Sequence, residues 1–405
     1  ATAAAFAQLR SGRPPATFNS AIEALLAAGQ TEDAAQRLAS RPGEFARRLD
    51  HLLRTAANPQ SVLQGFARVV DQVPTPLLLQ LHTHATHRDA PASLRSFYPK
   101  GEVAKVFAMA DARAPLPDGS AAALGELCQA TLLKRFATLA PLGDCYLDPA
   151  LRDHVVPLAQ RAASRSLRTL ARGSSLPLPD ADFVRMFLWW KNGRGRADVD
   201  LSAAMFGPNF DFIDALTYYR LQSYGGYHSG DIVDAPQGAA EFIDLDLERL
   251  RGRGVRFVVM VLNSFTGQPY CDLPECFAGW MARHDANSGE PFEPRTVMDR
   301  VDLTSNTMIS LPLALDLHAG RVRWMDVALR EQPRLNNVAN NLSGVSLMLR
   351  SLMTRPQPDL HTLFTLHARA RGRIVDDAQA ARTAFGVDGG ITPFDTDRIR
   401  AEFLV

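Results

Sequence analysis

The sequence predicts an α+β protein of several domains: an all-α region at residues 1–175, a central antiparallel β-sandwich at 176–335, and a C-terminal helical segment at 336–405 that packs on the others. In the first and last parts, apolar residues recur at helical spacing. In the middle part they gather in short runs rich in β-branched and aromatic residues, bounded by Gly, Pro, Asn or Asp. No helical stretch of 10–15 residues separates these runs, which favours a sandwich over a parallel sheet.

The bulk composition is that of an ordinary globular protein. The chain has 405 residues, 46% of them hydrophobic and 21% charged, with a net charge of +1. This length allows two or three domains with separate cores. Residues 1–175 carry more basic than acidic residues and the remainder carries more acidic ones, which indicates distinct partners or docking between the parts.

Localisation is expected to be cytoplasmic. The four cysteines are too few and too scattered for a secreted disulfide framework. Residues 1–6 lack the charged start and the long apolar run of a signal peptide. The apolar run at 257–262 is far too short to cross a membrane, so no membrane partner is expected.

The N-terminal region reads as a series of short helices, of the kind found in helical repeats or bundles, without a strict repeat length. Ser20 and Glu23 form a predicted capping box, Gly29 ends the first helix, and Thr31 caps the second. We expect helices at 24–28, 31–38, 45–56, 62–73, 76–86 and 121–139.

The pattern changes near residues 176–180, where two prolines stand close together. We expect strands at 184–190, 215–221, 241–247 and 257–262 and a hairpin of 307–317 with 322–329. Helical spacing returns at 342–353, 360–370 and 377–385.

The sandwich region contains acidic residues inside strand-like runs. Asp198, Asp200 and Ser202 alternate along the chain, so their side chains share one face of a strand. Two further acidic segments follow at 228–231 and 241–246. If the three segments converge, they form an oxygen-rich pocket suited to a hard cation such as Ca²⁺.

Several ordered motifs in residues 180–330 resemble the TerD-type tellurium-resistance and stress-protein family. The residues that carry the resemblance are Trp190, Asp198-Val199-Asp200-Leu201-Ser202-Ala203, His228-Ser229-Gly230-Asp231, Glu241, Asp244-Leu245-Asp246-Leu247 and Val258-Val259-Met260-Val261-Leu262. The resemblance implies a β-sandwich whose acidic loops bind Ca²⁺. The flanking segments resemble longer, poorly characterised bacterial relatives in which a helical region precedes such a domain.

The resemblance also implies a set of metal ligands. Asp198 and Asp200 match the first acidic motif, and Asp231 the Ser-Gly-Asp motif. Glu241 matches the last residue of an Asp-Asp-Glu run, with Asp244 in support. Ala239 and Ala240 stand at the two aspartate positions of that run, which removes two carboxylates and predicts one weakened site in place of two.

The function expected from these features is that of a non-enzymatic Ca²⁺-binding scaffold of the bacterial stress response, acting through a protein partner. One alternative is a metal-dependent hydrolase, although no common catalytic motif is present. A second alternative is an adaptor for nucleic acid or a phosphorylated partner, using a basic helix face. Its candidate anion-binding residues, spaced by four, three and four, are Arg161, Arg165, Arg168 and Arg172. The same arginines also fit a solvated face or a surface that docks on the acidic sandwich. The oligomeric state stays open.

Overall fold

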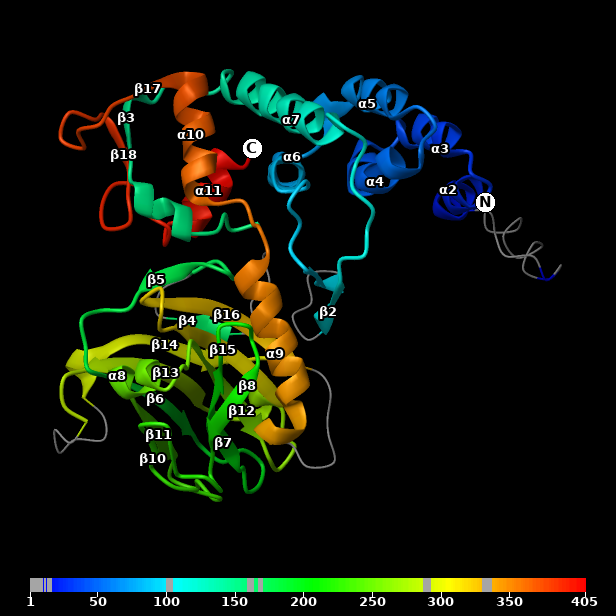
Figure 1. Ribbon diagram of the computed structural model, residues 1–405. Helices are drawn as coiled ribbons and strands as arrows, with labels where there is room; N and C mark the ends of the chain where they lie inside the picture. Colours follow the sequence, from blue (N-terminus) through cyan, green and yellow to red (C-terminus); the bar gives the residue numbers. More distant parts are fainter. Residues whose placement is uncertain are drawn as a thin grey trace.

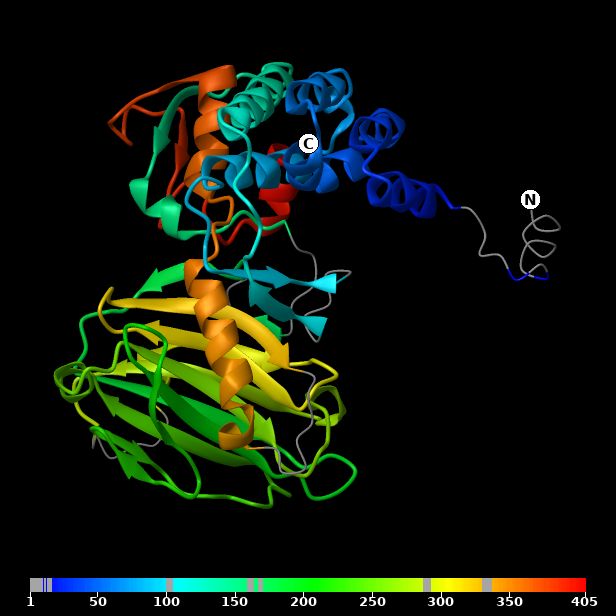
Figure 2. The ribbon, with the colours of Figure 1, turned by 45° about the vertical axis from the view of Figure 1, so that its right-hand side comes forward.

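The computed structural model describes residues 17–99, 105–158, 164–166, 170–286, 293–329 and 337–405, together with residues 10 and 12. Helices and a small sheet form one unit, here called the helical unit, and a β-sandwich forms the other (Figure 1). Turning the molecule shows the long helix α9 (Val338–Thr354) lying across the sandwich and leading up to the helical unit (Figure 2). The predicted order of α, then β, then α is confirmed. No described helix is both long and apolar enough to cross a membrane.

The helices of the N-terminal region lie close to their predicted positions. They are α2 (Phe18–Ala27), α3 (Thr31–Leu38), α4 (Pro42–Thr55), α5 (Pro59–Ala67), α6 (Thr75–Thr86) and α7 (Ser120–Phe136), with short 3₁₀ turns at Val70–Gln72 and Pro149–Asp153. The predicted capping box is displaced by one turn. Thr17 caps α2 by accepting a hydrogen bond from the Ser20 backbone, and the Ser20 hydroxyl accepts one from the Thr17 backbone.

Outside the sandwich, the chain also forms strands that the periodicity did not predict. β1 (Leu94–Phe97) and β2 (Phe107–Ala110) form an antiparallel hairpin that packs beside α9. β3 (Gly143–Leu147) lies between β17 (Gly372–Ile374) and β18 (Thr383–Phe385) in a small parallel sheet. The helix predicted at 377–385 is therefore wrong, because its last three residues pair with β3 instead.

The C-terminal segment is divided between the two units. α10 (Leu360–Arg371) and α11 (Thr396–Phe403) belong to the core of the helical unit, where Phe364 stacks on Phe385 and meets Phe403 edge-on. α9 instead packs its buried residues, among them Val345 and Leu349, on the sandwich. Burial of these apolar faces is what holds each helix in place.

The sandwich consists of two antiparallel sheets. The seven-stranded sheet has the order β4-β14-β13-β6-β11-β10-β9 and the six-stranded sheet the order β5-β16-β15-β12-β7-β8. Their bounds are β4 Ser164–Ser166, β5 Ser175–Pro177, β6 Phe183–Trp190, β7 Val199–Phe206, β8 Phe212–Leu216, β9 Gln222–Ser223, β10 Gly226–His228, β11 Ala239–Asp246, β12 Phe257–Ser264, β13 Cys276–Arg283, β14 Val297–Leu303, β15 Ile309–Asp316 and β16 Arg321–Leu329, with helix α8 at Leu247–Gly252.

Strand β7 is buried on both faces. Leu201, Ala203 and Met205 point into the core between the sheets, whereas Ala204 and Phe206 belong to the core under α9. Since strand side chains alternate, Asp200 and Ser202 lie on the same face as Ala204. Asp200, the acidic residue of β7, is thus directed to the outer face of the six-stranded sheet.

Candidate cation site

The first half of β7 has an edge without a neighbouring strand. β8 pairs with β7 only from Ala203 onward, so the backbone of Leu201 on that edge finds no strand partner. The side chains of Glu241 and His228 take the place of the missing strand partner. Leu201 N donates to Glu241 Oε2 over 2.9 Å, and His228 Nε2 donates to Leu201 O over 2.9 Å. These bonds satisfy buried peptide groups that would otherwise destabilise the fold.

The loop after β10 is held by the same two side chains. Gly230 N donates to His228 Nδ1 over 3.0 Å, and Ile232 N donates to Glu241 Oε1 over 3.1 Å. Asp231 lies between these two anchored residues. Its position beside β7 therefore follows from a hydrogen-bonded loop.

Asp198, Asp200 and Asp231 form a carboxylate cluster, here called the aspartate triad. One carboxylate oxygen from each lies within 4.8 Å of the others. Asp198 and Asp200 are buried, with 4% and 3% of their surfaces exposed, whereas Asp231 is exposed. The triad is thus a buried pair of carboxylates with one opening to solvent.

Negative charge exceeds positive charge around the triad in the described part of the chain. Burial, followed by the charges of Asp198 and Glu241, raises the pKa of Asp200 to about 8. Burial and the charge of Asp231 raise the pKa of Asp198 to about 6. Within the described residues, the cation paired with the triad is the exposed Arg196, 3.6 Å from Asp198. Asp200 Oδ2 is buried and has no hydrogen-bond partner.

Glu241 lies beside the triad with both of its oxygens already accepting backbone hydrogen bonds. Burial raises its pKa to about 8, against the effect of the bonds from Leu201 and Ile232. Its role in the structure is to hold β7 and the loop together. Glu241 therefore lies next to the triad, and its predicted role as a metal ligand stays a prediction.

Asp244 does not belong to the site, so its predicted supporting role is wrong. It is three residues from Glu241 on β11, so the two side chains lie on opposite faces of the strand. Its carboxylate accepts two hydrogen bonds from Arg185, over 2.6 and 2.7 Å, and the pair is buried. Ala239 and Ala240 lie opposite Trp190 and Trp189 on β6 and supply no ligand atom.

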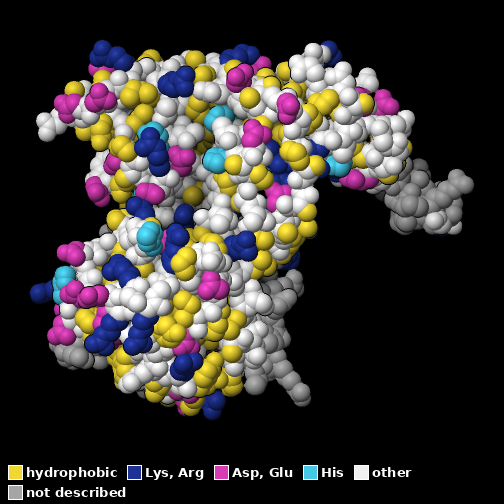
Figure 3. Space-filling model, in the orientation of Figure 1, with side chains coloured by type: hydrophobic (Ala, Val, Ile, Leu, Met, Phe, Trp, Pro, Cys, Tyr) yellow, Lys and Arg dark blue, Asp and Glu magenta, His cyan; other side chains and the backbone are white. Residues whose placement is uncertain are grey.

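The predicted basic helix face is not formed as expected. Arg161 and Arg168 lie outside the described residues. Arg165 is in strand β4, which pairs with β14, and not in a helix. Arg172 donates to the backbone and the carboxylate of Asp326, over 2.8 and 3.1 Å. On the face seen in Figure 3, basic and acidic side chains are interspersed.

Tyr218 is a neighbour of the triad that the sequence motifs did not identify. Burial raises its pKa, and the charges of Asp200 and Asp231 add to this effect, whereas a hydrogen bond with Asn337 lowers it. Asn337 caps α9 by accepting a hydrogen bond from Asn340 N. No spacing in the sequence connects Tyr218 with Asn337, because α9 reaches this end of the sandwich only in the folded chain.

The known proteins similar to this chain include several solved structures. No protein-family model and no curated protein matches the chain. A homologue of the telluride resistance protein TerD, SCO6318 from Streptomyces coelicolor, matches 41% of this chain and 98% of its own at 11% identity and a TM-score of 0.33. A protein of unknown function, SAV2460, matches 42% of this chain and 98% of its own at 14% identity and a TM-score of 0.31.

Proposed function

We propose that the aspartate triad binds Ca²⁺ and that the protein acts as a non-enzymatic Ca²⁺-binding scaffold. The observation that carries this proposal is the buried Oδ2 of Asp200, which has no hydrogen-bond partner and lies among other carboxylates. A buried carboxylate without a partner is costly. A divalent cation in the triad offsets this cost and the mutual repulsion of the three aspartates.

The donor set favours a hard cation. The triad offers carboxylate oxygens, and a neighbouring imidazole, that of His228, already uses both ring nitrogens in hydrogen bonds. Ca²⁺ prefers oxygen ligands and completes its shell with water. The exposed side at Asp231 leaves room for that water.

The effect of the ion is to connect two segments of the sandwich. Asp198 and Asp200 are at the start of β7, and Asp231 is in the loop after β10. A ligand that binds only the folded state stabilises it by about 2.7 kcal/mol at a hundred times its dissociation constant. Bound Ca²⁺ thus stabilises this end of the sandwich.

The same loop presents apolar side chains to solvent. Ile232 and Val233 follow Asp231 directly and are 37% and 42% exposed, and Tyr219 and Phe265 are exposed as well. Tyr218, a neighbour of the triad, contacts both Tyr219 and Phe265. The scaffold function then consists of presenting this surface to a protein partner, and the motif resemblance indicates the bacterial stress response as its setting.

The test is a Ca²⁺ titration followed by thermal melting. The wild-type protein, first treated with EDTA, is expected to melt several degrees higher at about 1 mM Ca²⁺, which saturates all but the weakest protein sites. Tb³⁺ should give luminescence sensitised by Trp190, whose indole N–H bonds to the carbonyl preceding Asp198.

Asp200→Asn is expected to abolish both signals, because it replaces a buried carboxylate ligand of the triad by an amide that cannot carry a negative charge. Asp180→Asn, an exposed aspartate of the same domain, is the matched control and should behave like the wild type. A wild-type melting curve that Ca²⁺ leaves unchanged would contradict the proposal.

A further inference from the structure

A polar cavity lies among residues 46–113 and 355–358, which are distant in sequence from the aspartate triad. Its volume is about 580 Å³, and α4, α6, the β1–β2 hairpin and the segment after α9 line it. Pockets of roughly 300–1,000 Å³ accommodate small organic ligands. Here it is called the arginine pocket, after the six arginines that line it: Arg47, Arg54, Arg88, Arg95, Arg113 and Arg355.

The arginine pocket carries an excess of positive charge. Its six arginines and three histidines face two carboxylates, Asp50 and Asp111. Even with neutral histidines, the lining has four more arginines than carboxylates, and one of these arginines, Arg47, is paired with Glu44 outside the lining over 3.7 Å. Charge of one sign in a cavity with low-dielectric walls concentrates ions of the opposite sign.

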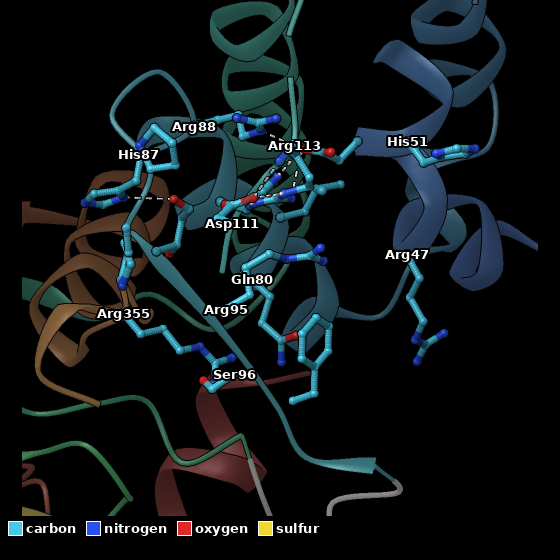
Figure 4. Close-up of a pocket in the computed structure, with 18 of the residues that line it drawn as sticks. Arg47, His51, Gln80, His87, Arg88, Arg95, Ser96, Asp111, Arg113 and Arg355 are labelled. Atoms are coloured by element: carbon cyan, nitrogen blue, oxygen red, sulfur yellow. Dashed lines mark hydrogen bonds and ion pairs between the residues drawn. The ribbon is translucent and has the colours of Figure 1, made fainter. Parts of the chain in front are cut away.

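Both carboxylates are already occupied. Asp50 accepts hydrogen bonds from Arg54, Arg88 and His84 over 2.7 to 2.9 Å. Asp111 accepts two from Arg113 over 2.8 and 2.6 Å. Figure 4 shows Arg113 directed to Asp111 in this way. Neither aspartate has capacity left to neutralise the remaining arginines.

Arg95 and Arg355 are the arginines that lack an acidic partner. In the described part of the chain no carboxylate forms an ion pair with either one. Arg95 lies over the ring of Phe97 at 4.8 Å, and Arg355 donates to the Ser96 hydroxyl over 3.3 Å. Burial lowers the pKa of both, and the charge of a neighbouring arginine lowers each further: Arg113 for Arg95 and Arg172 for Arg355. Two half-buried guanidiniums thus stand in the cavity without an anion.

We propose that the arginine pocket binds a small organic di- or triphosphate. Guanidinium groups form paired hydrogen bonds to phosphate oxygens, and the excess of positive charge suits a ligand with several negative charges. Leu77, Leu81, Pro91 and Phe97 supply an apolar wall for the organic part. The concave shape favours a small ligand over an extended nucleic acid strand.

The pocket connects distant parts of the chain, because Arg355 follows α9 whereas Arg95 is on β1. A ligand held by both would tie the segment between α9 and α10 to the helical unit. Arg355 reaches Ser96, as Figure 4 shows.

Binding is measured by calorimetry with pyrophosphate, ATP and adenosine, in EDTA so that the aspartate triad is empty. Both phosphates are expected to bind and adenosine alone to bind much more weakly. Tighter binding of ATP than of pyrophosphate assigns a role to the organic part, and equal binding assigns the site to the phosphate chain. Absence of heat with both phosphates overturns the proposal, whatever the outcome of the Ca²⁺ titration.

Two variants locate the site. Arg95→Ala and Arg355→Gln should each weaken pyrophosphate binding about tenfold or more, the loss expected for a charged hydrogen bond. Arg95→Lys keeps the positive charge but cannot form paired hydrogen bonds to phosphate, so its affinity for pyrophosphate should lie between those of the wild type and Arg95→Ala. This milder variant provides a second test if Arg355→Gln does not fold. Arg194→Ala, in an exposed loop of the sandwich, is the control. Unchanged pyrophosphate binding in folded Arg95→Ala overturns the proposal. Loss of binding in the control Arg194→Ala also overturns it, and so does displacement of bound pyrophosphate by single-stranded nucleic acid more readily than by ATP.

Discussion

Glu241 illustrates how one buried side chain takes the place of a missing strand. Its two oxygens accept hydrogen bonds from Leu201 and Ile232, and it is 1% exposed. Its raised pKa agrees with burial among other carboxylates. The carboxyl group at this position therefore orders the backbone on both sides of the aspartate triad.

Glu241→Ala is expected to lower the free energy of unfolding by about 1–3 kcal/mol for each backbone donor left unpaired. Glu241→Gln should cost less, because its amide oxygen can still accept one of the two bonds. Urea unfolding followed by tryptophan fluorescence measures the change, with the exposed Glu248→Ala as control. Equal stability of Glu241→Ala and wild type would show that water replaces both bonds.

The buried ion pair of Arg185 and Asp244 is a second case in which the loss of one side chain leaves a buried polar group without a partner. Both side chains are buried, and Arg185 also lies over the ring of Phe242 at 4.0 Å. Arg185→Met leaves a buried carboxylate unpaired, which typically costs about 3–5 kcal/mol. Arg185→Met combined with Asp244→Leu should cost much less, and a double-mutant cycle by urea unfolding measures the difference. Additive effects of the two substitutions would contradict this account.

At the scale of elements, β7 and α9 connect the sandwich core with the aspartate triad. β7 directs Leu201 and Met205 between the sheets and Asp200 to the opposite face. α9 covers that opposite face, and its capping residue Asn337 bonds to Tyr218 beside the triad. The helix thus belongs to the sandwich in energetic terms, although the chain continues from it into the helical unit.

Leu349→Ala on α9 is expected to destabilise the sandwich by about 2–5 kcal/mol, the cost of truncating a fully buried leucine. All four tryptophans of the chain, Trp189, Trp190, Trp280 and Trp324, are in sandwich strands, so their fluorescence reports on this unit. Ser343→Ala on the exposed side of α9 is the control. A fluorescence midpoint equal to that of the wild type would show that α9 contributes little to the sandwich.

Element types were largely predictable where apolar spacing was regular. Helices α4, α6 and α10 and strands β6, β11 and β12 lie within a few residues of their predicted bounds. The strand at Thr383–Phe385 was not predictable, since its pairing partner β3 is more than 230 residues away in the sequence. Local periodicity does not report on pairing of this kind.

At the scale of the whole molecule, the helical unit depends on a charged network centred on Asp50. Burial raises the pKa of Asp50, but hydrogen bonds from His84, Arg54 and Arg88 and the charge of Arg113 outweigh burial and hold the pKa well below its usual value. Hydrogen bonds from Arg113 lower the pKa of Asp111 to about 2. Residues from α4, α6 and the hairpin meet in this network.

A carboxylate with a lowered pKa stabilises the fold above its unfolded pKa, and this contribution is lost as the pH falls through the folded value. The helical unit should therefore lose stability between about pH 4 and pH 2, by an amount on the order of 2 kcal/mol for Asp111. Far-UV circular dichroism during urea unfolding at several pH values measures this. Asp111→Asn should be less stable at neutral pH and show a flatter pH dependence. If the free energy of unfolding of Asp111→Asn depends on pH as steeply as that of the wild type, the loss of stability at low pH comes from groups other than Asp111.

The sequence by itself determined the order of the parts and the shared face of Asp198 and Asp200, because alternation along a strand is a local property. It also singled out Asp231 in the segment that the fold brings beside them. Only the tertiary structure decided that Glu241 faces the triad while Asp244 faces Arg185, because the inward face of a strand depends on the sheet that packs against it. The arginine pocket was equally invisible in the sequence, since Arg95 and Arg355 become neighbours only when the segment after α9 returns to the helical unit.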